Sequence, residues 1–381
     1  MKKNLQKNNL LVCLALLGST QIYAEKQGDV VLKKHDSDKR SNQNTVVATI
    51  NTGVTPSDIA ITPNNKFAYV VNSNNFGVEG ADTITVIDLK TNLVVATISD
   101  PSFSDLSTIT IDSRLNRAYV TNGTGTTISV IDLATNQVIN TITGFDGPSS
   151  MVIVPGTNIA YVSNFGTDTG TGAGTGTTVN VVNLANNTIT GAPITVGTGP
   201  TALGISRNGN FIYALNYGDG TMGTGTLSVI QRSTNMVIST ITGFSGPSAI
   251  AITPDGRFAY VTNAGSNDLD PIGNTISIVD LQTNTVVNTI PVGLEPSDVV
   301  FSSNGRLAYV SNFNTFFENN TDATGIVAGA GTVTIIDTKT GRVVAPTIEV
   351  GQSPTALAIA KDNLYVTNGT SNTVSVIPIK G

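Results

Sequence analysis

The chain has 381 residues, of which only 12% are charged, and its 20 Lys and Arg residues are outnumbered by 26 Asp and Glu residues. This acidic balance disfavours binding to nucleic acid or to an anionic membrane surface. Aromatic residues are few, Trp is absent, and Gly, Thr and Asn crowd the segments between apolar runs. Such a composition is typical of many short strands joined by turns, and it predicts an all-β fold.

Residues 1–24 have the pattern of a bacterial-type secretory signal peptide, with lysines at the start, an apolar core over 10–17 and a plausible cleavage site at 22–24. This predicts export, to the periplasm or to the cell surface, of a mature chain without a membrane span. Cys13, the only cysteine, lies in the apolar core and lacks the small residues that precede a lipidated cysteine. Removing the three lysines of this segment leaves 17 basic against 26 acidic residues, a net charge of −9. Residues 25–44 are polar and lack periodicity, which indicates a flexible leader.

From residue 45 onward the chain repeats one pattern: an apolar run, a short turn such as Pro254-Asp255-Gly256, and a second apolar run closed by Asn. A Tyr stands three residues before the closing Asn in each of seven copies, which are spaced 42 to 56 residues apart. Because they recur, these residues are predicted to serve the repeat itself, the Tyr in packing and the Asn as an amide that bonds nearby backbone and starts a turn. The pairs are Tyr69/Asn72, Tyr119/Asn122, Tyr161/Asn164, Tyr213/Asn216, Tyr260/Asn263, Tyr309/Asn312 and Tyr365/Asn368.

Each repeat is predicted to hold four strands, A to D. The last repeat has an A, a B and a C but no D, and a D-like strand at 45–50 precedes the first repeat without a partner. These observations predict a seven-bladed β-propeller of four-stranded antiparallel blades over 45–381, closed by strand 45–50 in the last blade. The strands of the first repeat are predicted at Ser57–Thr62, Phe67–Val71, Thr83–Asp88 and Leu93–Ile98, and those of the last at Thr355–Ala360, Leu364–Thr367 and Thr373–Ile379.

The phrase Ala-Tyr-Val-Thr-Asn at 259–263, with Pro-Asp-Gly-Arg before it and Ile-Val-Asp-Leu-x-Thr-Asn after it, resembles the repeat of the YVTN-family β-propellers, as in YncE-like proteins. The resemblance covers 45–381 and implies the propeller fold. Related propellers serve as surface proteins, binding scaffolds and enzyme domains that carry cofactors, so the resemblance implies no single activity.

The inserts of the repeat are unequal and should all lie on one face. In an up-and-down blade the D-to-A and B-to-C links share a face, and the short A-to-B and C-to-D turns lie on the other. From each closing Asn to the next strand C there are 11, 5, 14, 10, 12, 20 and 5 positions, so repeats 3 and 6 carry the longest inserts. Variable loops on a rigid frame are where binding sites are usually found.

Aromatic residues in these inserts are the predicted binding residues. Three phenylalanines in the insert of repeat 6 are unusual in a chain this poor in aromatics, and they could form an apolar contact for a partner or ligand. The alternative is that the rings fold inward and cap the blades, as Phe145 and Phe244 of the D-to-A links could also do. The candidates are Phe313, Phe316, Phe317, Phe165, Tyr217 and Phe76.

Metal and cofactor signals are weak. Asp268 and Asp270 could offer oxygens to calcium, but a dedicated loop needs more ligands at fixed spacing and a glycine at the sharp turn, so solvated carboxylates are the simpler interpretation. No cofactor is predicted. Four basic residues follow A-to-B turns, on the face that holds the short turns. They could form a weakly basic rim there, or they could simply be solvated side chains at the edge of the blades. They are Lys66, Arg117, Arg257 and Arg306.

The sequence offers little for catalysis. The only histidine, His35, lies in the predicted leader, which argues against histidine-based acid–base chemistry in the ring. We therefore expect an exported non-catalytic scaffold that binds a protein partner or an extended polymer through the face carrying the D-to-A and B-to-C links. Two alternatives stay open: a hydrolase or lyase that uses carboxylates at the centre of the ring, with or without calcium, and a structural component of the cell surface or envelope.

Overall fold

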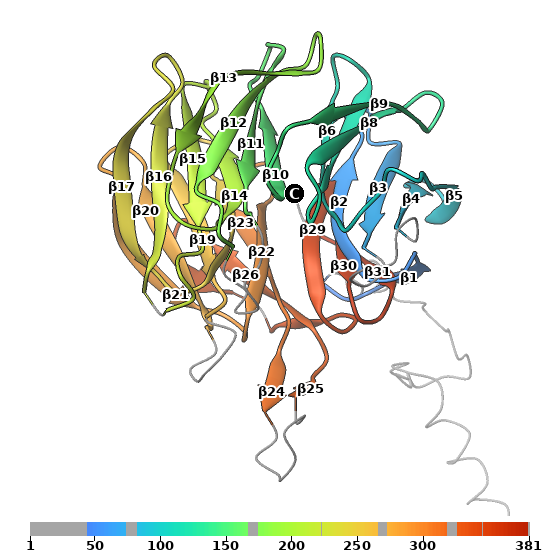
Figure 1. Cartoon of the computed structure of the whole chain (residues 1–381). Coiled ribbons are helices and arrows are strands. Elements are labelled where there is room, and N and C mark those ends of the chain that lie inside the picture. The colour runs from blue at the N-terminus through green and yellow to red at the C-terminus, as the bar shows by residue number, and fades with distance from the viewer. Residues whose placement is uncertain are drawn as a thin grey trace, which may run out of the picture. The chain divides into compact units, whose positions relative to one another are not determined.

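Each repeat forms one antiparallel sheet, and seven such sheets make a closed seven-bladed β-propeller (Figure 1). The computed structural model describes residues 44–73, 82–166, 174–221, 223–265, 273–317, 326–344 and 346–379, with 315–317 and 326–328 described by their backbone alone. The expected fold class is confirmed.

The first three blades contain one strand of each kind, in the order A, B, C, D. Blade 1 consists of β2 (Pro56–Ile61), β3 (Phe67–Asn72), β4 (Thr83–Asp88) and β5 (Leu93–Ile98). Blade 2 consists of β6 (Leu106–Asp112), β7 (Arg117–Asn122), β8 (Thr127–Asp132) and β9 (Gln137–Thr143). Blade 3 consists of β10 (Pro148–Ile153), β11 (Ile159–Asn164), β12 (Thr178–Asn183) and β13 (Thr188–Thr195).

The last four blades follow the same order, and blades 6 and 7 depart from it in strand D. Blade 4 consists of β14 (Pro200–Ile205), β15 (Phe211–Asn216), β16 (Gly225–Gln231) and β17 (Met236–Phe244), and blade 5 of β18 (Pro247–Ile252), β19 (Phe258–Asn263), β20 (Thr275–Asp280) and β21 (Thr285–Pro291). Blade 6 consists of β22 (Pro296–Phe301), β23 (Leu307–Asn312) and β26 (Thr332–Asp337), with strand D split into β27 (Arg342–Val343) and β28 (Ile348–Glu349). Blade 7 consists of β29 (Pro354–Ala360), β30 (Asn363–Asn368) and β31 (Thr373–Pro378), completed by β1 (Ala48–Asn51).

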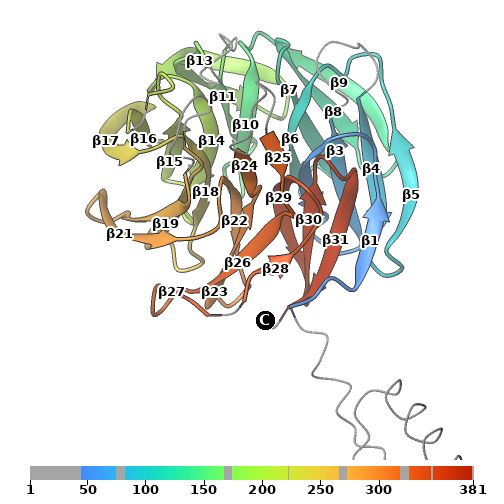
Figure 2. The same ribbon diagram turned by 90° about the horizontal axis from the view of Figure 1, so that it is seen from below.

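The first and last strands that the structure describes lie side by side in blade 7. Strand β1 pairs with β31, with Ala48 opposite Val376 and Asn51 opposite Thr373, so the blue and red ends of the chain share one sheet (Figure 2). The predicted closure is confirmed, but the strand is shifted from the predicted 45–50 to Ala48–Asn51. The residue before it still joins the sheet, because the Val47 N–H donates to Val376 O at 2.9 Å.

The core lies between neighbouring blades, which explains why strands B and C are apolar on both faces. In β3 every residue after Phe67 is buried, whereas in the outer strand β5 only Ile98 is buried. One cluster joins Tyr69 and Val71 of blade 1 to Leu106 and Ile109 of blade 2, and the other interfaces repeat this arrangement. The seven repeated tyrosines are all buried, as their packing role predicts.

Hydroxyl groups link the innermost strands into a closed ring. The Ser or Thr at the second position of each strand A donates to a backbone carbonyl of the next blade's strand A, and Thr355 of blade 7 closes the ring by donating to Pro56 O of blade 1 at 2.7 Å. The other six donors, with their acceptors, are Ser57 (Ser107 O, 3.1 Å), Ser107 (Ser149 O, 3.3 Å), Ser149 (Pro200 O, 2.7 Å), Thr201 (Pro247 O, 3.4 Å), Ser248 (Pro296 O, 2.9 Å) and Ser297 (Pro354 O, 2.6 Å).

The repeated Asn residues bond nearby backbone, as predicted, and also join two strands. In blade 2, Asn122 Oδ1 accepts the Ser104 N–H at 3.1 Å, and Asn122 O accepts the Gly125 N–H of the hairpin turn at 3.0 Å. All seven are buried, and each Nδ2 also donates to side chains of the neighbouring strand C. Asn216 Nδ2, for example, donates to Thr226 Oγ1 at 2.9 Å and to Ser228 Oγ at 3.0 Å. The amide therefore joins the end of strand B to the start of strand C, beside the B-to-C link. Its acceptors are Thr and Ser side chains of strand C, except in blade 3, where Asn164 Nδ2 donates to Thr178 Oγ1 and to Asn180 Oδ1.

Candidate functional site

All long connections emerge on one side of the ring. We call this side the link face, because it holds the D-to-A and B-to-C links, and we call the opposite side the turn face. Strands A and C run one way in each blade and strands B and D the other, so the antiparallel order of every sheet fixes these two faces. The link face is the side from which strands β24 and β25 project in Figure 1.

The insert of repeat 6 forms a separate ribbon on the link face. Strand β24 (Thr315–Phe317) pairs with β25 (Ile326–Ala328), Thr315 lying opposite Ala328, and neither strand joins a blade. The base of the ribbon is tied to the ring. The Gly329 N–H donates to Asn314 O at 3.1 Å, and Asn314 Nδ2 donates to Thr332 Oγ1 of strand C at 2.8 Å. The two ends of the ribbon are therefore hydrogen-bonded to each other, and one of them also to strand C of blade 6.

Three of the predicted binding residues, Phe165, Tyr217 and Phe313, occupy equivalent positions, each directly after the closing Asn of its repeat. Their backbone N–H groups donate to a carbonyl of the D-to-A link, for Phe313 to Glu295 O at 3.1 Å. Phe165 and Phe313 are half-buried, whereas Tyr217 is buried and donates its hydroxyl to Gly265 O at 3.4 Å. These positions are spread around the face in blades 3, 4 and 6.

The remaining predicted residues are only partly covered by the structure. Phe316 and Phe317 lie in β24, whose backbone alone is described. Phe76, Asp268 and Asp270 lie outside the described residues. Among the residues that the structure does describe, no three His, Cys, Asp or Glu side chains come close enough together to hold a metal ion. In the same part of the chain, no helix is long and apolar enough to cross a bilayer.

Two carboxylates that were not singled out from the sequence lie on the innermost strands. Asp58 of β2 accepts the N–H of Ile59 at 2.7 Å and the N–H of Ile109, on the next blade's strand A, at 2.8 Å. Asp298 of β22 repeats this arrangement with Val299 at 2.7 Å and with Leu357 of β29 at 2.8 Å. Each carboxylate therefore bridges two innermost strands, and both lie near the link-face end of those strands.

Both carboxylates have a pKa near neutrality. Enclosure by the inner strands raises the pKa of Asp58 from 3.8 to about 6, although its two backbone hydrogen bonds act in the opposite direction. The same desolvation raises the pKa of Asp298 to about 7, with a smaller contribution from the negative charge of Asp58. Each side chain keeps some exposed surface, so water reaches part of it. Groups that titrate near neutral pH in such surroundings are suited to proton transfer.

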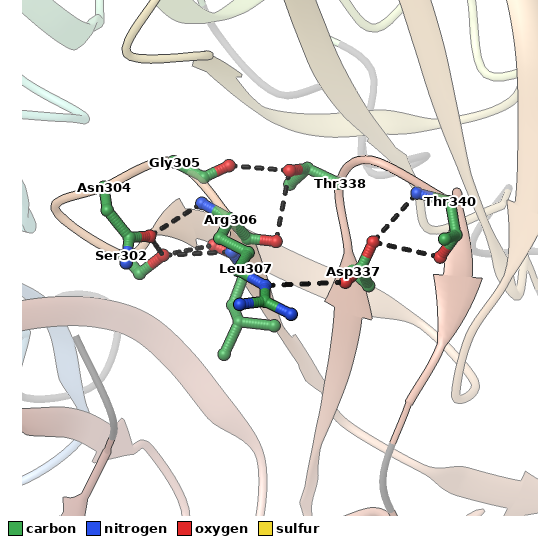
Figure 3. A network of polar contacts seen from close by, with 8 residues as sticks. All are labelled: Ser302, Asn304, Gly305, Arg306, Leu307, Asp337, Thr338 and Thr340. Carbon is green, nitrogen blue, oxygen red and sulfur yellow. Dashed lines mark hydrogen bonds and ion pairs between the residues drawn. The ribbon is translucent and has the colours of Figure 1, made fainter.

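The turn face is built from short, tightly bonded turns. In blade 6, Thr338 Oγ1 donates to Gly305 O at 2.6 Å, and Arg306 Nε lies 3.9 Å from Asp337 Oδ2, so the A-to-B and C-to-D turns are joined (Figure 3). Asp337 also accepts the N–H and hydroxyl of Thr340, and the backbone bond is the main cause of its lowered pKa. In blade 6 the turn face is therefore closed by hydrogen bonds and one ion pair.

The two faces differ in charge, because all the basic residues of the described ring lie on the turn face. Every Lys and Arg of the described ring lies in, or directly beside, a turn of the turn face, where seven acidic residues accompany these 11 basic ones. The link-face half holds nine acidic residues and, among the described residues, no basic one. The basic residues are Lys66, Lys90, Arg114, Arg117, Arg207, Arg232, Arg257, Arg306, Lys339, Arg342 and Lys361. The nine acidic residues are Asp58, Asp82, Asp100, Asp105, Asp146, Asp219, Glu295, Asp298 and Glu349.

Comparisons with known proteins agree with this architecture. A family model described as "Lactonase, 7-bladed beta-propeller" matches residues 221–317, which is 97 of the 381 residues. The chain is a β-propeller protein. A solved structure of similar fold is that of Kuenenia stuttgartiensis hydrazine synthase, with a TM-score of 0.72 and 18% sequence identity over 86% of this chain and 97% of that one. At this level of identity the likeness is one of fold alone. A search of the curated proteins found no match.

Proposed function

We propose that the protein is an exported binding propeller of the YVTN type, which holds a protein partner or an extended polymer on its link face. The observation that carries this proposal is the one-sided elaboration of the ring. The turns of the turn face are short in every repeat, whereas the links reach 20 positions in repeat 6 and include the ribbon β24–β25. A rigid frame with a single elaborated face is the usual design of a recognition surface.

The ribbon can be removed without disturbing the blade. Asn314 and Gly329 are already joined by a backbone hydrogen bond, so 315–328 can be replaced by an Asn-Gly turn. Repeats 2 and 7 reach strand C in five positions after their closing Asn, which shows that a bare hairpin suits this fold. We expect the variant to keep its melting temperature and to lose a partner that the full chain captures from an envelope fraction. Capture of the same partner at undiminished yield would place binding elsewhere.

Export is the second part of the proposal, and its support is the pattern of residues 1–24. Fractionation of cells that express the full chain should place the protein in the periplasm, on the surface or in the medium. Tight association with an envelope fraction, with no captured partner, would instead favour the structural envelope component.

A second candidate function is the hydrolysis of a lactone or another ester, favoured by the near-neutral pKa values of Asp58 and Asp298 and by the name of the partly matching family. The ionised carboxylate would take a proton from water, whose oxygen attacks the carbonyl carbon, and the ring oxygen would leave and take up a proton. A panel of lactones, assayed with and without chelator, tests this. Activity lost in both Asp58→Asn and Asp298→Asn would support it.

We favour the binding function over this hydrolase. Both oxygens of each carboxylate already accept a backbone N–H, which leaves them less free to bind water and to move a proton. The bridging bonds also give each carboxylate a structural role that needs no substrate.

A further inference from the structure

The charge on the link face limits the kind of partner that fits it. Asp146 and Asp219 are exposed, and Asp100, Asp105 and Glu295 are half-buried. The basic residues of the described ring all lie on the opposite side, so the described ring places no Lys or Arg beside Asp100, Asp105, Asp146 or Asp219. The inserts outside the described residues contain no Lys or Arg in their sequences either. A face with one sign of charge attracts partners of the opposite sign and repels those of its own.

The ribbon β24–β25 offers a point of attachment on the same face. It is a two-stranded sheet that pairs with no blade, and among the described residues no third strand pairs with the outer edge of either strand. An unpaired edge can accept an extended peptide as an added strand, through main-chain hydrogen bonds. An isolated ribbon of two strands is also only marginally stable, and it gains most from such an addition.

We propose that the link face docks an extended segment of a protein partner that is rich in Lys and Arg. The segment pairs with the ribbon β24–β25 along an open edge, and its basic side chains meet the carboxylates of the D-to-A and B-to-C links. The inference rests on the proposed binding function and names the chemistry of its partner. An acidic segment or a polyanion is excluded by the sign of the face.

The test uses two charge variants of the full ring with the same change in net charge. The link-face variant is Asp105→Asn/Asp146→Asn/Asp219→Asn. The matched turn-face control is Asp88→Asn/Asp132→Asn/Asp362→Asn. Asn keeps an acceptor oxygen for the turn bonds that these side chains make, such as the bond from the Thr221 N–H to Asp219 Oδ1. Circular dichroism and melting curves establish that both variants fold.

The probe is a fluorescein-labelled peptide of alternating Lys and Val, compared with its Glu and Val counterpart by fluorescence anisotropy at low and high salt. We expect binding of the Lys peptide only, weakened by salt, with a Kd raised about tenfold in the link-face variant and nearly unchanged in the control. Three lost charge pairs at a solvated surface give an effect of this order. Equal weakening in both variants would mean unspecific attraction to an acidic protein and would overturn the inference.

The ribbon replacement separates this inference from the proposed function. If the replacement abolishes capture of a native partner while neither charge variant nor salt affects it, the link face binds and the basic-segment inference falls. If neither the ribbon replacement nor the charge variants affect capture, both the proposed binding function of the link face and the basic-segment inference are wrong. Concentration-dependent sedimentation of the protein alone, lost in the link-face variant, would identify the occupant as the basic turn face of a second copy and would also overturn the inference.

Discussion

The backbone N–H of Asn44 donates to the carbonyl oxygen of Pro378 at 3.1 Å, although these residues come from opposite ends of the ring's sequence. The same bond closes the intact C-to-D turn of blade 1, where the Asn92 N–H donates to Asp88 O at 2.8 Å. Asn44 has φ 60° and Asn92 has φ 55°, a left-handed conformation that Asn tolerates better than most residues. The turn of blade 7 is therefore formed without a covalent connection between its two halves.

Removal of this closing segment should damage the whole ring. A chain that begins at Thr52 lacks Asn44 and β1, so β31 is left with an unpaired edge in water. We expect unfolding to become less cooperative, the melting temperature to fall, and oligomers to form. Calorimetry and analytical ultracentrifugation measure these effects, with a chain that begins at Gln43 as the control. A monomer of unchanged melting temperature would show that the closure is dispensable.

The hydroxyl that closes the inner ring should contribute measurably to stability. Thr355→Val keeps the shape of the side chain but removes the 2.7 Å bond to Pro56 O and the 2.8 Å bond with Thr367 Oγ1, and the expected loss is about 1–2 kcal/mol in the free energy of unfolding. Thr201→Val is the matched control, because Thr201 Oγ1 makes longer bonds, at 3.4 Å to Pro247 O of the next blade and at 3.2 Å to Leu215 O of its own blade. Urea denaturation should give a smaller loss for Thr201. Equal losses would argue against a special role for the closing bond.

The two inner carboxylates should make stability depend on pH. Their pKa values are raised in the folded protein, so their contribution to the free energy of unfolding is fully present below about pH 4 and is lost as the pH rises through about 6 for Asp58 and about 7 for Asp298. The wild type should therefore lose roughly 1–3 kcal/mol from these groups between pH 5 and 8, since solvent at the exposed part of each carboxyl reduces the full effect. Urea midpoints of Asp58→Asn/Asp298→Asn should change less over this interval. A parallel decline in both proteins would disprove the assignment.

The close contact of Gly53 with two side chains under the link face should not tolerate a methyl group. A Cβ at Gly53 would lie 2.7 Å from both Asn72 Cγ and Thr83 Oγ1, so Gly53→Ala must displace the buried amide that joins strands B and C. We expect a loss of about 1–3 kcal/mol in the free energy of unfolding. At Gly125 the nearest atoms lie at 3.4 Å, and Gly125→Ala should stay within about 0.5 kcal/mol of the wild type. A harmless Gly53→Ala would mean that the link can move aside.

The blades could be predicted from sequence because each strand is bounded by turn residues and repeats seven times. Strands β4 and β5 begin and end at the predicted residues, Thr83–Asp88 and Leu93–Ile98. The repeat also predicted closure of the ring. The predicted strand D at 45–50 had no repeat of its own, and the last repeat had no strand D, so the two were expected to share one sheet. Strand β1 begins at Ala48 rather than at residue 45, although the Val47 N–H already donates to Val376 O at 2.9 Å, so the predicted bounds and the observed ones differ only at the ends of the strand.

The site was harder to predict, because it depends on which residues of different blades meet. Asp58 and Asp298 stand where other repeats have Ala249 or Ala356, and this departure was the available signal. Its meaning became clear only when strand A was known to be innermost, with Ile109 of the next blade within reach of Asp58. The role of the closing Asn residues likewise depends on register, because their hydroxyl acceptors lie on another strand. The division of charge was visible only in part, as four basic residues of a set of 11.

Each of the seven interfaces contains a hydroxyl bond from one strand A to the next, although these bonds differ in length from 2.6 to 3.4 Å. No single interface is therefore required to be the seam. A circularly permuted chain can be opened in the C-to-D turn of blade 2 and joined by a short linker from Ile379 to Asn44. We expect its new termini to lie in blade 2 and the chain to fold into the same seven-bladed propeller.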